Sequence, residues 1–187
     1  TRFRQKDIES AARHFSNALK IYPDHQKARK GLDNVTKQFL NAGNKSYKRG
    51  DLGKATSYYQ KALEFDPEFY LAYFQLGILQ KKQGQSKEAL ASLNKVLEIS
   101  PEHDKTWFTL GTVHEFDGQI QNAIEHYSKA IEINPGYSKA YGNLAKLYTE
   151  SDELKKAEDI LKTVIQIDPN YSDGFMRLGL LYIKIEN

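Results

Sequence analysis

The sequence predicts an all-α protein built as a solenoid of antiparallel helix hairpins. Its prolines are the first reason, because the last four of five are spaced 34 residues apart: Pro67, Pro101, Pro135 and Pro169. A similar stretch precedes each of these four, as in Ala-Leu-Glu-Phe-Asp before Pro67 and Ala-Ile-Glu-Ile-Asn before Pro135. A fixed period of this length is typical of stacked helical repeats.

Each period divides into two helices, as the segment 104–137 shows. The spacing i, i+3, i+4, i+7 marks one face of a first helix, formed by Trp107, Leu110, Gly111 and His114. Asp117-Gly118 interrupts that pattern, and a second apolar face follows at Ala123, Tyr127 and Ala130. Pro135 then ends the second helix, because proline lacks the backbone donor that a helix interior requires.

The first two prolines depart from the period, since Pro23 and Pro67 are 44 residues apart. Apolar and small residues nevertheless continue in steps of three and four between them, at Ala28, Leu32, Val35, Phe39, Ala42 and Ser46. We therefore predict one helix over 24–49, roughly 39 Å long at 1.5 Å per residue. The alternative is a pair of shorter helices with a kink near Gly31 or Asn34.

These periods resemble the tetratricopeptide repeat family, whose pattern is Trp-x2-Leu-Gly-x2-Tyr, Ala-x3-Phe, Ala and Pro. The match in 138–171 comprises Tyr141, Leu144, Ala145, Tyr148, Ala157, Leu161, Val164 and Pro169. The resemblance covers nearly the whole chain and implies a right-handed superhelical solenoid.

The repeat boundaries follow from the same alignment of periods. The expected segments are a partial hairpin 1–23 (second helix only), a helical extension 24–35, repeats 36–69, 70–103, 104–137 and 138–171, and a partial repeat 172–187 (first helix only). The chain begins with half a hairpin and without Met, so we expect a fragment of a longer protein.

Composition narrows the function. The net charge of +3 is too small to predict nucleic-acid binding, and no apolar run is long enough to predict a membrane span. The chain has no cysteine, and its five histidines form no His-Glu-x-x-His motif, so we predict no metal site and no cofactor. We expect a binding protein rather than an enzyme, in the cytoplasm, and we interpret His114 as a packed core residue.

The resemblance implies that the first helix of each hairpin lines a concave groove. The positions that line it carry nine Lys or Arg against three Asp or Glu, so we predict an acidic, extended peptide or protein segment as the partner. A polar side chain recurs at one repeat position and could hydrogen-bond a peptide backbone. The candidate groove residues are Asn41, Asn44, Phe74, Gln75, Ile78, Lys105, Phe108, Thr109, Thr112, Lys139, Asn143 and Arg177.

Several readings of this groove remain open. Asn is common at the recurring polar position in the family, and Phe74 and Phe108 could instead pack between repeats. The chain could be the substrate-targeting region of a larger enzyme, such as a protein O-glycosyltransferase, or an architectural segment of a multi-protein complex. It fits poorly the family members that clamp the carboxylate of chaperone tails, because only Asn44 and Lys105 match that clamp.

The last helix carries the final prediction. Its sequence is apolar around much of its circumference, and we expect Phe175, Leu178 and Tyr182 to pack back on the preceding repeat. Leu181 and Ile185 would then be exposed, so we expect the chain either to self-associate through this end or to continue into another repeat in the parent protein.

Overall fold

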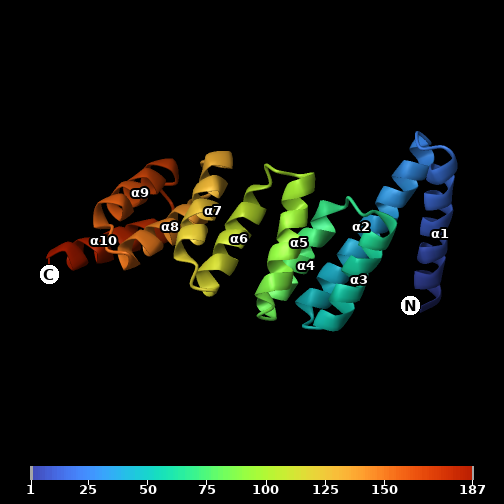
Figure 1. The fold of residues 1–187 in the computed structure, drawn as a ribbon, viewed down its shortest axis with the longest axis horizontal. Helices are drawn as coiled ribbons and strands as arrows, with labels where there is room; N and C mark the ends of the chain where they lie inside the picture. Colours follow the sequence, from blue (N-terminus) through green and yellow to red (C-terminus); the bar gives the residue numbers. More distant parts are fainter. Residues whose placement is uncertain (1, 187) are drawn as a thin grey trace. The chain divides into compact units, whose positions relative to one another are not determined.

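The computed structural model describes residues 2–186, with side chains from residue 7 onward. Over that range the chain forms ten α-helices and no strand (Figure 1). The helices are α1 (Arg2–Ile21), α2 (Gln26–Lys48), α3 (Leu52–Phe65), α4 (Tyr70–Lys82), α5 (Ser86–Ile99), α6 (Asp104–Phe116), α7 (Ile120–Ile133), α8 (Ser138–Glu150), α9 (Leu154–Ile167) and α10 (Ser172–Glu186). None of these helices is both long and apolar enough to cross a membrane.

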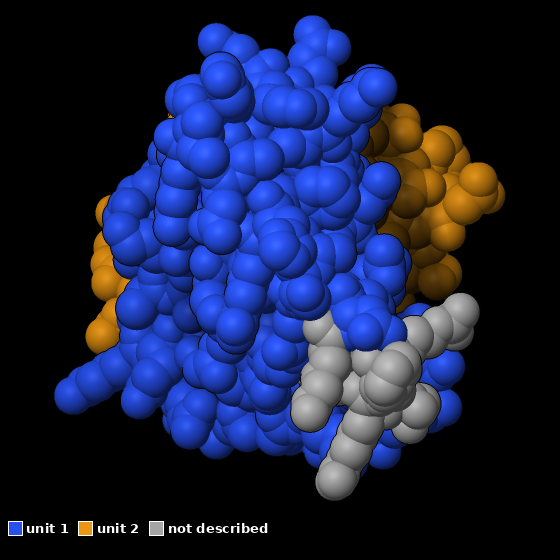
Figure 2. Space-filling view, turned by 90° about the vertical axis from the view of Figure 1, so that its right-hand side faces the viewer, with its two compact units in different colours: residues 1–100 blue, residues 101–187 orange. Residues whose placement is uncertain are grey.

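The helices group into two compact units, Thr1–Ser100 and Pro101–Asn187, coloured separately in Figure 2. In each unit every helix packs on the next one along the chain. The first helices of neighbouring hairpins also meet, since α2 contacts α4 and α8 contacts α10. This arrangement confirms the predicted all-α array of helix hairpins.

The predicted long helix is present as α2, which runs through Gly31 and Asn34 without a break. The ring of Phe15 on α1 explains why residue 31 is glycine, because a β-carbon there would lie 2.5 Å from the ring. The side chain of His25 caps the first turn by accepting a hydrogen bond from the Ala28 amide at 3.3 Å. Both α1 and α3 pack on α2, so this one helix serves two hairpins.

Four of the hairpins reverse at a left-handed residue, those formed by α2 and α3, α4 and α5, α6 and α7, and α8 and α9. Gly50, Gly84 and Gly118 have φ angles of 80°, 73° and 72° and follow the ends of α2, α4 and α6. Glycine suits this position because it lacks the β-carbon that makes positive φ costly. Asp152 takes the same place after α8 with φ of 60°, a conformation that Asp tolerates better than most residues.

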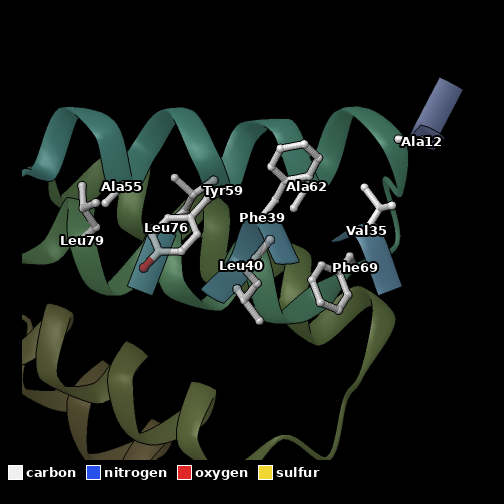
Figure 3. Close-up of a cluster of buried hydrophobic side chains, with 11 residues drawn as sticks. Ala12, Val35, Phe39, Leu40, Ala55, Tyr59, Ala62, Phe69, Leu76 and Leu79 are labelled. Atoms are coloured by element: carbon white, nitrogen blue, oxygen red, sulfur yellow. The ribbon is translucent and has the colours of Figure 1, made fainter. Parts of the chain in front are cut away.

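Small residues let the two helices of a hairpin approach closely. A β-carbon on Gly43 would lie 2.4 Å from the ring of Tyr59, and one on Gly77 would lie 2.7 Å from Leu93. Tyr59 belongs to the core of the first unit, which is formed by side chains of α1, α2, α3 and α4 (Figure 3). Phe39 within this core stacks on Phe65 of α3, with ring centroids 5.9 Å apart.

The last helix packs differently from our prediction. Leu181 is only 2% exposed and lies in a core cluster with Ala145, Ala157 and Leu161, so the expectation that it is exposed was wrong. Leu178 packs against this cluster as predicted, and Ile185 is exposed as predicted.

Phe175 is 50% exposed, against our prediction, whereas the ring of Tyr182 is 40% exposed but its hydroxyl still contacts the preceding repeat by donating to Glu158 on α9 at 2.9 Å. The repeat explains why. Trp107 and His114 hold the same positions in α6, and both rings contact His126 on the second helix of their own hairpin. The corresponding face of α10 has no such helix among the described residues.

Candidate functional site

The candidate residues of the first unit lie on α2 and α4. Asn41 is exposed, whereas Asn44, Gln75 and Ile78 are half-buried. Phe74 is only 9% exposed and contributes more to packing than to an open surface. The two helices contact each other, so these side chains belong to neighbouring segments of one face.

Asn44 is oriented by the second helix of its hairpin. The Tyr59 hydroxyl donates a hydrogen bond of 2.8 Å to Asn44 Oδ1. Burial, with a smaller contribution from Tyr47, raises the pKa of Tyr59 to about 12, so the phenol stays a neutral donor. The Asn44 amide nitrogen is left without a partner among residues 7–186 and can donate to a ligand.

Basic side chains gather at the carboxyl ends of these two helices. The Lys82 ammonium lies 4.9 Å from the centre of the Tyr47 ring, which joins α4 to α2 by a cation–π contact. Neither Lys48 nor Lys82 has a carboxylate within 4.0 Å in the described part of the chain. Lys81 is half-buried, and this burial lowers its pKa. We call Tyr47, Lys48, Lys81 and Lys82 the basic face of the first unit.

In the second unit, several of the candidate groove residues make contacts within the protein. Phe108 lies against Tyr127 and Tyr137, with ring centroids 5.5 and 4.9 Å away. Thr109 is buried, and its hydroxyl donates to the Lys105 carbonyl at 2.6 Å. The Thr112 hydroxyl donates to the backbone in the same way. The open alternative for Phe108, that it packs rather than faces a ligand, therefore agrees with its contacts.

Asn143 belongs to a hydrogen-bonded chain across three helices. Its amide donates to the Tyr127 hydroxyl at 3.1 Å, and that hydroxyl in turn donates to Glu115 on α6. The other Glu115 oxygen binds the Lys146 ammonium of α8 at 2.8 Å. The hydrogen bond to Glu115 raises the pKa of Lys146. The Lys146 charge is thus already balanced within the protein.

The cations of α10 are paired as well. Arg177 Nε donates to Asp173 at 2.6 Å, and the Lys184 ammonium lies 3.3 Å from Asp152. Burial alone would raise the pKa of Asp173, but hydrogen bonds from Arg177 and the Tyr171 hydroxyl outweigh it and lower the pKa. Lys105 and Lys139 are exposed and have no ion-pair partner in the described range. Within the described residues, the counted cations without an ion-pair partner therefore include Lys48 and Lys82 on the first unit and Lys105 and Lys139 on the second.

A cavity between α8 and α10 was not singled out from the sequence. Its volume is about 180 Å³, and it is lined by Ala145, Lys146, Thr149, Glu150, Leu161, Arg177, Leu180, Leu181 and Lys184. Only Arg177 of these was a candidate. Lys146, Thr149, Glu150, Leu180 and Lys184 hold repeat positions that were predicted to line the groove, whereas Ala145, Leu161 and Leu181 are core residues.

The remaining candidates for site chemistry are the metal-ligating side chains and the histidine pair His114 and His126. No group of three or more His, Asp or Glu side chains that could hold a metal ion occurs among the residues described. The His114 and His126 rings lie 4.8 Å apart, and each ring nitrogen Nδ1 is hydrogen-bonded within the protein, to Gln119 Oε1 and to the Asn122 carbonyl. The two rings pack on each other between α6 and α7, but both are half-buried, so His114 is a packing residue rather than the core residue that we expected.

Solved structures with the same architecture support the repeat assignment. A crystal structure of MamA is 27% identical, covering 79% of this chain and 80% of that one with a TM-score of 0.69. YrrB, described as a tetratricopeptide-repeat protein with an unusual peptide-binding site, is 25% identical and covers 95% and 86% with a TM-score of 0.65. PilF of Pseudomonas aeruginosa shares the fold at 18% identity, covering 82% and 70% with a TM-score of 0.74.

Sequence profiles identify the family. Three profiles described as tetratricopeptide repeat match residues 40–69, 58–91 and 117–177, which together make up more than half of the chain. No functionally curated protein matches the sequence. The chain belongs to the tetratricopeptide-repeat family, whose helical arrays are protein–protein interaction scaffolds.

Proposed function

We propose that this scaffold binds an extended, acidic segment of a partner protein along the first helices of its hairpins. The observation that carries the proposal is the basic face of the first unit. Lys48 and Lys82 have no carboxylate partner within the described residues, so an acidic ligand can satisfy them without breaking an internal ion pair. Such unpaired, exposed cations favour acidic partners chiefly through the association rate and specificity.

Two amides beside the basic face support binding of an extended backbone. Asn44 keeps its amide nitrogen available because Tyr59 occupies only its oxygen. Gln75 on the adjacent helix is half-buried, with no hydrogen bond to any described side chain. Side-chain amides can both donate to and accept from a peptide main chain, so they bind it independently of its sequence. The peptide-binding site named for YrrB is consistent with a peptide ligand here.

In this proposal, the cations of the second unit contribute less to the preference for an acidic ligand than those of the first unit. Lys146, Arg177 and Lys184 already have acidic partners, and an acidic ligand would have to compete with them. Lys105 and Lys139, near the starts of α6 and α8, are exposed and extend the basic character. The acidic preference should therefore depend most on Lys48 and Lys82.

The test is a fluorescence anisotropy titration with short labelled peptides of Gly, Leu and Glu, or the same peptides with Gln or Lys in place of Glu. We expect the Glu peptide to bind best and the Lys peptide worst, with affinity falling as salt rises because exposed charges are screened. The variant Lys48→Glu, Lys82→Glu should weaken the Glu peptide at least about tenfold at low salt.

The matched control is Lys27→Glu, Lys30→Glu, which reverses two exposed charges near the start of the same helix α2. It changes the net charge equally and should leave the affinity almost unchanged. Equal loss in both variants would mean that total charge, not the basic face, governs binding. A Gln peptide that binds as tightly as the Glu peptide would refute the acidic preference.

A further inference from the structure

The cavity between α8 and α10 has an apolar floor. Ala145, Leu161 and Leu181 form this floor, and none of them is more than 2% exposed. Leu180 lines the same cavity but is 59% exposed, so it forms an accessible wall. The floor belongs to the packed core of α8, α9 and α10, which makes the cavity a fixed feature of this unit.

The size of the cavity matches one side chain. Its volume is about 180 Å³, whereas an engineered apolar cavity of about 150 Å³ binds benzene. A phenyl ring or a branched aliphatic side chain therefore fits. Water gains little there, because the floor offers no hydrogen-bond partner and a bound water needs two to four of them. An apolar group that enters would replace poorly bonded water and bury apolar surface.

Three cations and one acid line the cavity: Lys146, Arg177, Lys184 and Glu150. The two lysines are held in place, Lys146 by Glu115 and Lys184 by the Thr149 carbonyl at 2.7 Å. Arg177 donates through Nε to Asp173, and its terminal N–H groups have no partner within residues 7–186. A guanidinium with unused terminal donors is suited to a carboxylate, which accepts two parallel hydrogen bonds.

We infer that this cavity binds an apolar side chain of the partner, with a carboxylate on the same ligand held by Arg177 at the rim. The inference rests on the proposed function, since an apolar residue beside a carboxylate is the kind of anchor that an acidic partner segment can supply to the second unit by itself. Asp173, Glu115 and Asp152 already balance the three lining cations, so the selectivity comes from the terminal N–H groups of Arg177, which can donate to a carboxylate but gain nothing from a cationic neighbour of the apolar group. A preference for acidic ligands is therefore expected at this cavity as well as at the basic face of the first unit.

The smallest probe with both features is 3-phenylpropionate, a phenyl ring with a carboxylate two carbons away. Its neutral and cationic counterparts are 3-phenylpropionamide and 3-phenylpropylammonium. Titration of the ¹H–¹⁵N spectrum of the chain with 3-phenylpropionate should give saturable shifts concentrated on α8 and α10. The amide should bind at least about threefold more weakly, which corresponds to an exposed charge pair, and the ammonium more weakly still.

Two variants separate the apolar and charged parts, each with a matched control. Leu180→Ser removes the accessible wall, and Ile183→Ser changes a residue of similar exposure (60%) on the same helix that does not line the cavity. Arg177→Gln removes the rim guanidinium, and Lys162→Gln removes another cation with an i,i+4 acidic partner, Glu158, away from the cavity. Only Leu180→Ser and Arg177→Gln should weaken 3-phenylpropionate, each at least about threefold.

Circular dichroism checks that each variant is folded before it is compared. The inference is overturned if 3-phenylpropionate causes no saturable shifts on α8 and α10, if the amide or the ammonium binds as well as the acid, or if the control variants weaken binding equally. The proposed function is tested separately, because the Glu peptide would still depend on Lys48 and Lys82. A protein that binds that peptide but not 3-phenylpropionate refutes the cavity site alone.

Discussion

The ring of Tyr127 lies directly against the backbone of Gly111. A β-carbon built on Gly111 would be 2.6 Å from two carbons of that ring, closer than real side chains come. Gly179 holds the same repeat position on α10, but a β-carbon there would have no neighbour within 4 Å. Of these two glycines at equivalent repeat positions, packing requires Gly111 and does not constrain Gly179.

Substituting these two glycines by alanine should have opposite effects. Gly111→Ala must displace the Tyr127 ring, and overpacking of this kind costs about 1–3 kcal/mol of unfolding free energy. Gly179→Ala meets no neighbour and gains helix propensity, so it should be neutral or stabilise by up to about 1 kcal/mol. Urea unfolding followed by circular dichroism measures both. Two variants of equal stability would show that the close approach has no energetic consequence.

The continuity of α2 gives a second prediction. Leu32→Pro should destabilise the first unit by about 3 kcal/mol or more, because proline removes a helical hydrogen bond and clashes with the preceding turn. The matched control is Gln26→Pro at the first helical position. His25 before it is already extended, with ψ of 90°, as a residue preceding proline prefers. Thermal unfolding should separate the two variants, and equal melting temperatures would contradict a structural role for the middle of α2.

Histidines in the second unit predict lower stability in acid. Burial lowers the pKa of His126, a hydrogen bond to the Asn122 carbonyl opposes this, and neighbouring His114 lowers it further. The folded state therefore binds a proton less readily than the unfolded state, whose histidine pKa is near 6.5. The stability contributed by neutral His126 is complete above that pH and is lost as pH falls through the lowered folded value.

The measurement is the urea midpoint between pH 7.5 and pH 5, a range of about one unit or more on each side of the free histidine pKa. We expect the midpoint to fall toward pH 5 and the fall to be smaller in His126→Gln. His14→Gln serves as the control, because His14 is exposed on α1. An unchanged pH profile in His126→Gln would show that this imidazole does not govern the acid sensitivity.

The sequence predicted the fold well because the repeat itself carries the packing information. The steps of three and four between Ala28 and Ser46 correctly predicted that α2 is one helix. The error at Leu181 came from treating α10 as a bare amphipathic helix. Its counterparts Leu79 and Val113 hold the same repeat position and are fully buried, so a comparison between repeats would have placed it in the core.

The details of the candidate site were harder to predict, because they depend on side-chain pairing between hairpins. A count of charges treats Lys146 as available, yet Glu115, 31 residues earlier in the chain, binds its ammonium. Phe108 is likewise on a predicted groove position but turns its ring to Tyr127 and Tyr137. Periodicity assigns a residue to a helix face, whereas rotamers and neighbours decide what its side chain contacts.

Self-association through α10 stays a prediction, with a different surface from the one expected. Phe175 and Tyr182 form an exposed stripe with Gly179 between them. The Tyr182 hydroxyl donates to Glu158 on α9, but no described helix packs on these two rings as α7 packs on Trp107 and His114. Burying a large apolar side chain contributes about 1.5–3 kcal/mol, so association that covers both rings is favourable. Sedimentation velocity over a range of concentrations should show association that Phe175→Ser, Tyr182→Ser abolishes.

The matched control for this surface is Met176→Ser, Ile183→Ser. These two residues are similarly exposed and have the same spacing of seven on α10, but each lies one position further along and therefore on a different helix face. This variant should associate like the unsubstituted chain. Substitution of Leu181 is not a suitable probe, because it would disrupt the core of α8, α9 and α10. If both double variants remain associated, α10 is not the interface; if both become monomeric, general hydrophobicity rather than the Phe175 stripe drives association.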